Sequence, residues 1–133
     1  MATRSYIGKM NPETNTVTYI YCHYDGYPSH NGRLLSENYN DKNKVDQLLE
    51  LGDLSFLDEQ IGEQHDFKNP TKGWTVSYSR DRGEQYQNSR STAKLEDYNR
   101  DPGIDYFYLF TEEKWKYSEG NGWKDLVFEK SEA

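Results

Sequence analysis

The run at residues 104–111 constrains the fold more than any other part of the chain. Phe107, Leu109 and Phe110 stand among tyrosines there, so consecutive positions are large and apolar. Successive side chains of a strand point to opposite faces of a sheet, so a run of this kind is typical of a strand covered on both faces. We therefore expect a central strand here.

Other β-rich runs provide neighbours for this strand. Residues 3–9 and 16–21 flank the stretch 11–15, whose Asn and Pro residues favour a turn, so we expect an opening β-hairpin. Residues 114–118 are expected to pair back as a second hairpin. Residues 123–130 fit either a last strand or a short helix, and we predict a strand.

Helical spacing appears in the middle of the chain. Residues 29–39 are expected to form a first helix, and an Asn-Asp pair then offers the cap of a second. In that second helix apolar residues recur at i, i+3 and i+4 from Val45 onward, and Gly52 ends it. Two short helical segments are also expected, one capped by Asp53 and one over residues 92–98.

This order of elements indicates an α+β fold, with a mostly antiparallel sheet and helices packed on one side. At 133 residues the chain fits a single domain, residues 1–133. Apolar residues make up only 33% of it, but aromatic residues reach 15%, and large rings can supply the burial that aliphatic residues do not. We therefore expect an aromatic core.

The sequence also restricts the environment of the protein. A single cysteine allows no internal disulfide, and neither an apolar leader nor an apolar run of about 20 residues is present. We expect a cytoplasmic protein without a membrane partner.

The net charge of −7 argues against direct nucleic-acid binding, which normally takes a basic surface, and favours a basic protein partner. Carboxylates concentrate in the predicted helical portion, where they could imitate the phosphates of a duplex and occupy the basic channel of a host protein. An ordinary solvated helix face has the same composition. The acidic residues assigned to this contact are Glu37, Asp46, Glu50, Asp53, Asp58 and Glu59.

Residues 19–33 contain the highest concentration of side chains that could bind a metal or act as a nucleophile. Cys22, His23, Asp25 and His30 are possible ligands of a divalent metal, and His65 with its neighbouring aspartate could add to them. Adjacent residues on a strand point to opposite faces, however, and no CxxC or HExxH spacing is present. The alternative is a buried thiol, a surface histidine and residues that fold the loop. A Cys/His nucleophile is a further possibility, but nothing in the sequence identifies an orienting acid or an oxyanion hole for it.

A second candidate follows a predicted strand at residues 74–78, in which Trp, Val and Tyr alternate with small polar residues. The next stretch, 79–84, carries Arg80 and Arg82, which could grip a carboxylate or phosphate, or be neutralised by their own acidic neighbours. Beside the 19–33 loop they would form a tyrosine-rich face for an anionic ligand or a protein. The residues assigned to this face are Tyr24, Asp25, Tyr27, His30, Arg33, Arg80 and Arg82.

Four motifs resemble a family of small uncharacterised proteins from phages and prophages: TRSYIG at 3–8, YIYCHYDGYP at 19–28, LGDL at 51–54 and SRDRGE at 79–84. The resemblance implies a genomic context but no catalytic role. We assign no catalytic residue, metal ligand or cofactor, and an enzyme is the less favoured class.

The leading hypothesis is a phage-type accessory protein that inhibits a host-defence factor stoichiometrically, as anti-CRISPR proteins do, with mimicry of nucleic acid by an acidic surface as one mechanism. That role is an analogy of class. The alternative is a binding protein or an enzyme that takes a small ligand, nucleotide or metal through the Cys22 to Arg33 loop with Arg80 and Arg82. A third option is a phage structural protein.

Overall fold

The predicted central strand is β6 (Tyr106–Thr111) in the computed structural model, which describes residues 3–83 and 91–126. The side chains of Phe107 and Leu109 join the apolar cluster on one face of the sheet, and those of Tyr108 and Phe110 join the cluster on the other. All four are buried. The strand is therefore covered on both faces, as its composition predicts.

The opening hairpin is also confirmed. β1 (Ser5–Asn11) and β2 (Thr16–Cys22) are antiparallel and pair from Ser5 with Cys22 to Asn11 with Thr16. β1 then lies parallel to β6, and β6 pairs with β7 (Lys114–Ser118) as the second hairpin. β8 (Lys124–Asp125) follows as the outer strand, whereas the rest of the predicted last strand from residue 127 lies outside the described residues.

The other edge of β2 carries two short strands. β5 (Ser91–Lys94) pairs antiparallel with its first half, and β3 (Leu54–Phe56) pairs parallel with its end, where Cys22 opposes Leu54. β4 (Val76–Ser77) adds to β3. Within the described ranges the strands form one sheet of eight, mixed but mostly antiparallel, which confirms the α+β class.

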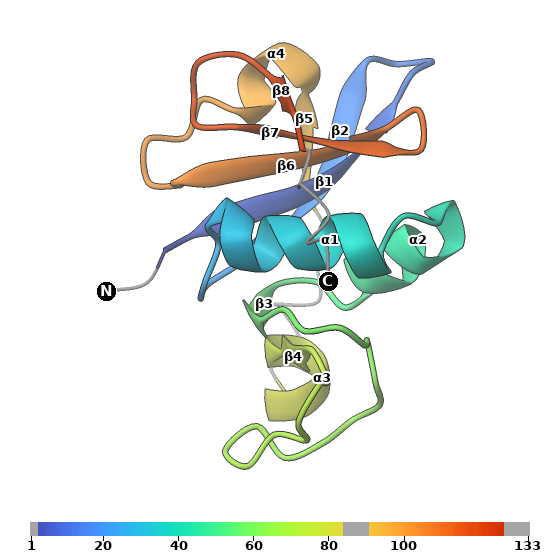
Figure 1. The fold of residues 1–133 in the computed structure, drawn as a ribbon, viewed down its shortest axis with the longest axis vertical. Coiled ribbons are helices and arrows are strands. Elements are labelled where there is room, and N and C mark those ends of the chain that lie inside the picture. The colour runs from blue at the N-terminus through green and yellow to red at the C-terminus, as the bar shows by residue number, and fades with distance from the viewer. Residues whose placement is uncertain (1–2, 84–90, 127–133) are drawn as a thin grey trace, which may run out of the picture.

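The predicted helices of the middle segment cover one face of this sheet (Figure 1). A π-helical turn, η1 (Pro28–Gly32), leads directly into α1 (Arg33–Asn38), and α2 (Lys42–Glu50) follows. Leu35, Val45 and Leu48 are fully buried and pack with Ile7 and Ile20 of the sheet. The period of the α2 sequence therefore gives its buried face correctly.

The opposite face is covered by α4 (Leu95–Tyr98). Tyr98 is buried with Val17 and Phe107, and its hydroxyl donates a 2.7 Å hydrogen bond to the carbonyl of Tyr108. The two main helices thus share one side, as predicted, and a single helical turn lies on the other.

Three local predictions were wrong. Asp53 does not cap a helical turn, because the next residues form β3 beside the end of β2. Residues 92–94 belong to β5, where the backbone hydrogen bonds of β2 outweigh a helical preference. Tyr78 does not end a strand but begins α3 (Tyr78–Arg82), since Ser77 caps that turn. The loop predicted after residue 84 lies mostly outside the described residues.

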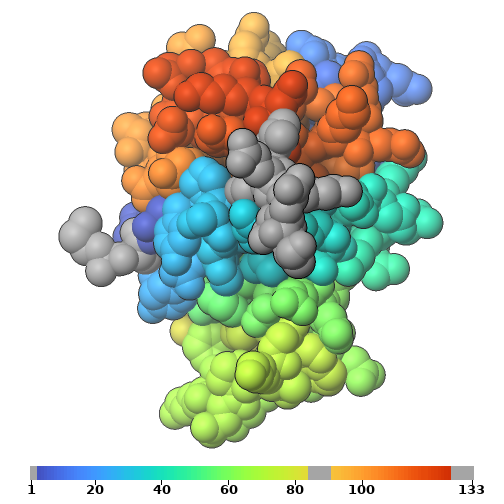
Figure 2. Space-filling model, in the orientation of Figure 1, coloured from blue at the N-terminus to red at the C-terminus, as the bar shows by residue number. Residues whose placement is uncertain are grey.

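The segment from Leu57 to Arg82, green to yellow in Figure 2, forms one end of the molecule. Within its irregular backbone an isolated parallel bridge joins Gln60 to Trp74, which lies two residues before β4. In the part of the chain that the structure describes, no helix combines the length and hydrophobicity needed to cross a bilayer.

Candidate functional site

Cys22 is the last residue of β2, and its side chain and that of the next residue, His23, lie on opposite sides of the chain. The Cys22 thiol is fully buried, receives a 3.4 Å hydrogen bond from Nδ2 of Asn31 and donates one of 3.6 Å to the carbonyl of Tyr24. Burial raises its pKa to about 11, so the thiolate that a nucleophile requires is strongly disfavoured. The expectation of a small buried thiol is confirmed.

His23 lies on the other side, where its Nδ1 is 2.6 Å from the hydroxyl of Tyr21. Its ring packs edge-on against Tyr24, with 4.5 Å between centroids. Cys22 and His23 therefore cannot share a ligand. In residues 3–83 and 91–126, no three His, Cys, Asp or Glu side chains are placed to hold one metal ion together.

The loop that follows is folded largely by its own contacts. Asp25 has a positive φ of 55° and accepts a 3.2 Å hydrogen bond from the Tyr27 hydroxyl. His30 donates from Nε2 to the carbonyl of Leu57 over 3.1 Å, and Arg33 forms an ion pair with Glu37 at 3.1 Å. Of these predicted contact residues, Tyr27 and Arg33 are exposed, whereas Asp25 and His30 are partly buried.

The two predicted arginines differ sharply. Arg80 points into the protein, with only 17% of its side chain exposed, and donates to the carbonyls of Ile61 and Thr75 at 2.8 and 2.7 Å. It also forms two hydrogen bonds with the fully buried carboxylate of Asp81. Arg80 therefore holds the loop before β4 in place, and it is already occupied.

Asp81 is the centre of this buried polar cluster. It accepts hydrogen bonds from the backbone N–H groups of His65 and Ser77 at 3.1 and 2.8 Å, besides those from Arg80. Burial opposes its ionisation, but these donors outweigh burial and lower its pKa. The ring of His65 is fixed as well, donating to the carbonyl of Thr75 and accepting from the N–H of Thr71.

Arg82 lies elsewhere on α3. Its guanidinium carbon is 4.8 Å from the ring centroid of Phe67 and 4.7 Å from that of Tyr78, so it stacks on two aromatic rings. Residues two positions apart on a helix point in nearly opposite directions. The turn that buries Arg80 therefore presents Arg82 at the surface.

Arg82 and the strand end meet in an open groove of about 460 Å³, which we call the tyrosine–arginine groove. Tyr24 is 48% exposed on it. The 19–33 loop, through Tyr24, and the 79–84 stretch, through Arg82, thus lie beside each other, as the hypothesis of a tyrosine-rich face required. The groove is lined by Tyr21, His23, Tyr24, Ser55, Phe67, Tyr78 and Arg82.

Sequence reasoning assigned only Tyr24 and Arg82 of this set to a contact surface. Tyr21 and Tyr78 looked like ordinary strand residues, because alternation does not tell which face stays uncovered. Phe67 did carry a signal, since it is the only large apolar residue in the polar stretch 62–72. Backbone hydrogen bonds from His23 and Tyr24 to the carbonyls of Leu54 and Ser55 bring β3 to the groove.

The six predicted acidic contact residues do not form a continuous surface of unpaired carboxylates. Asp46 forms a 2.7 Å ion pair with Lys9, and Glu37 is paired with Arg33. Asp53 is half-buried and accepts from the N–H of Tyr21, and the carboxylate of Asp58 accepts from the N–H of Glu59. The side chains of Glu50 and Glu59 are exposed.

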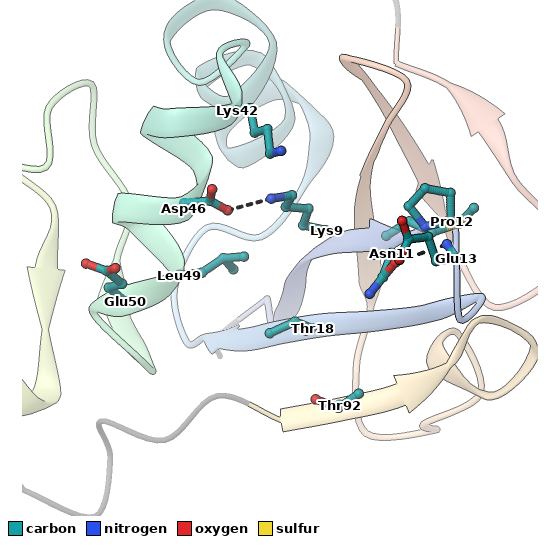
Figure 3. A pocket seen from close by; sticks show the side chains of 11 residues that line it. Lys9, Asn11, Pro12, Glu13, Thr18, Lys42, Asp46, Leu49, Glu50 and Thr92 are labelled. Carbon is teal, nitrogen blue, oxygen red and sulfur yellow. Dashed lines mark hydrogen bonds and ion pairs between the residues drawn. The ribbon is translucent and has the colours of Figure 1, made fainter.

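A wider polar hollow of about 890 Å³ lies between α2 and the strands (Figure 3). Its floor includes Thr18 and Thr92, which oppose each other on β2 and β5. Lys9 and Asp46 bridge it, and Glu50 stands at its wall. Charges of both signs line this hollow and it lacks aromatic side chains among the described residues, so it is less suited than the groove to anchor a partner.

The tyrosine–arginine groove is thus the candidate site. Its parts come from β2, β3, α3 and the loop before β4, so no single motif contains it. Comparison of the chain with protein-family models, with curated proteins and with solved structures finds no match.

Proposed function

We propose that the protein binds another protein through the tyrosine–arginine groove. The observation that carries the proposal is the convergence of Tyr24, Tyr78, Phe67 and Arg82 around an open groove in which Tyr24 is 48% exposed. Tyrosine and arginine are the residues most enriched in the energetic centres of protein interfaces, because they combine large apolar area with hydrogen bonding.

The contacts among the groove's own side chains support this use. Tyr21 and His23 are joined by a 2.6 Å hydrogen bond, and Arg82 is fixed over two rings. A side chain that is already ordered loses little conformational entropy when a partner binds. The open form also suits a protein segment better than a small ligand, which is usually enclosed on most sides.

For the biological role we propose the one that the phage resemblance favours, stoichiometric inhibition of a host-defence factor. The net charge of −7 favours a host protein with a basic nucleic-acid-binding surface. We place the anchoring contact in the groove and not on the acidic helices, since Asp46 and Glu37 are already paired with cations.

Site-specific photo-cross-linking in a bacterial host lysate tests this proposal. A benzophenone amino acid replaces Tyr24 in one variant, and Gln47, exposed on α2 and outside the hollows described, in the other. We expect one protein to be cross-linked from position 24 and not from position 47. The cross-link should disappear when Phe67→Ser removes an aromatic wall of the groove, with circular dichroism confirming the fold.

A charge-removing variant separates the groove from acidic mimicry. Glu37→Gln, Asp46→Asn and Glu50→Gln combined should leave the cross-link from position 24 in place. Loss of the cross-link in that variant, together with its survival in Phe67→Ser, would refute the groove proposal in favour of the acidic helices. The captured protein, once purified, should bind with one-to-one stoichiometry by titration calorimetry.

A further inference from the structure

Resting on the proposed function, we infer that a lysine or arginine side chain of the partner enters a second hollow beside the tyrosine–arginine groove. This second site, which we call the tyrosine–aspartate hollow, has a volume of about 330 Å³, and its lining includes Tyr6, Tyr19, Tyr21, Asp53 and Asp101. Aromatic rings and carboxylates are the groups that attract a cationic side chain. The volume is at the small end of the range for ligand pockets, which suits a single long side chain.

The three tyrosines of the hollow come from the opening hairpin. Tyr6 of β1 opposes Tyr21 of β2, and Tyr19 precedes Tyr21 by two residues, so all three side chains project from one face of the sheet. The ring centroid of Tyr6 is 4.6 Å from that of Tyr19 and 6.5 Å from that of Tyr21. All three residues are only partly buried. A cation within about 6 Å of such a ring is attracted by the negative face of the ring.

The two carboxylates of the hollow are held by the same cross-strand pair. Asp53 accepts a 3.1 Å hydrogen bond from the N–H of Tyr21, and Asp101 accepts one of 2.6 Å from the Tyr6 hydroxyl. Both donors are neutral, and neither carboxylate forms an ion pair within residues 3–83 and 91–126. Burial raises the pKa of Asp53, whereas the hydrogen bonds from Tyr6 and Gly103 lower that of Asp101. A cation in the hollow would stabilise the ionised form of both.

Arg4 opposes this attraction without cancelling it. Among the described residues that line the hollow it is the one cation, and its exposed side chain forms no ion pair with any of them. Its backbone N–H donates to a third carboxylate, that of Asp105, over 3.0 Å. Three carboxylates and one guanidinium leave this region with a net negative charge, so a cation is still attracted and removal of Arg4 should strengthen the attraction.

The position of the hollow fits the proposed interface. Tyr21 lines both the hollow and the tyrosine–arginine groove, so the two form one continuous surface. A partner segment with an apolar side chain in the groove can therefore place a neighbouring basic side chain in the hollow. The net charge of −7 attracts the same class of partner, and a protein surface that binds nucleic acid presents Lys and Arg side chains.

Fluorescence anisotropy with the intact protein tests the inference. The probes are a short labelled peptide of Lys and Phe and the same peptide with its lysines acetylated, which removes the positive charge. We expect the lysine peptide to bind at least about tenfold more tightly than the acetylated one, with the difference shrinking as salt is raised. Asp101→Asn should weaken its binding about threefold or more, and Arg4→Gln should strengthen it about threefold. Circular dichroism confirms that each variant is folded.

The control is Glu112→Gln, which removes the same charge as Asp101→Asn from an exposed residue outside the hollows described and should change affinity less than about twofold. Equal losses in these two variants would indicate attraction to the acidic molecule as a whole and would overturn the hollow as the site. Equal binding of both peptides, with the cross-link from position 24 intact, would overturn the cationic side chain and leave the protein-binding function standing. Lysine-peptide binding that depends on Asp101, without any cross-linked protein, would refute only the proposed function.

Discussion

Neutralising Asp81 should weaken the fold, because this carboxylate is the counter-charge of a nearly buried guanidinium. The side chain of Asp81 is 0% exposed and that of Arg80 17%, and the closest approach between them is 2.9 Å. Breaking a buried ion pair by removing one partner costs about 3 kcal/mol or more, since the remaining charge stays uncompensated. For a chain of this size that loss lowers the melting temperature by roughly 10 °C.

Urea denaturation of Asp81→Asn, followed by circular dichroism at neutral pH, measures the loss. The matched control is Asp46→Asn, whose carboxylate is 44% exposed in its pair with Lys9 and should cost less than about 1 kcal/mol. If both variants lose the same small amount, the reasoning about Asp81 is wrong.

The pH dependence gives a second check on Asp81. Its pKa is lowered below the ordinary value of 3.8, so its contribution to stability is complete above that pH and is lost as pH falls through the folded-state pKa. The difference in unfolding free energy between wild type and Asp81→Asn should therefore shrink in strong acid. A difference that stays constant into strong acid would refute the assignment.

Three further outcomes are expected. Gly62→Ala should destabilise the protein more than Gly73→Ala, because both residues have positive φ but an added Cβ at Gly62 would collide with the Trp74 ring, whereas Gly73 has open space; thermal melts compare them. Tyr39→Phe should cost about 1–2 kcal/mol in urea, since the buried Tyr39 side chain loses the 2.7 Å hydrogen bond that its hydroxyl donates to the carbonyl of Asp58. The Cys22 thiol, with a pKa of about 11, should react with Ellman's reagent roughly a hundredfold more slowly in the native protein than in urea.

The elements that the sequence predicts well are those whose pattern is local and repeated. β6 is identified by consecutive apolar residues, and α2 by its spacing and by Gly52, which has a positive φ of 73° after the helix. The opening hairpin needs only a turn between two β-rich runs. In each of these the neighbouring residues contain the information that decides the structure.

β3 and β5 depend instead on a distant partner. Both are short, and both exist because β2 offers an open edge with unpaired backbone groups. The parallel pairing of β1 with β6 joins segments about a hundred residues apart, which no local pattern announces. For the same reason the groove could not be predicted from the sequence, since Phe67 and Tyr21 line it together from segments that are far apart along the chain.

For Arg80 and Arg82, the sequence leaves only one structural question undecided. Ser77 and Gly83 are readable as the cap and the stop of one helical turn, and within such a turn Arg80 and Arg82 cannot face the same side. What the sequence leaves open is which side is buried. That is decided by His65 and the carbonyls of Ile61 and Thr75, which converge on Arg80 and Asp81 from the preceding loop. By occupying Arg80, this loop leaves Arg82 as the arginine of α3 that lines the groove, and the same loop delivers Phe67 beneath it.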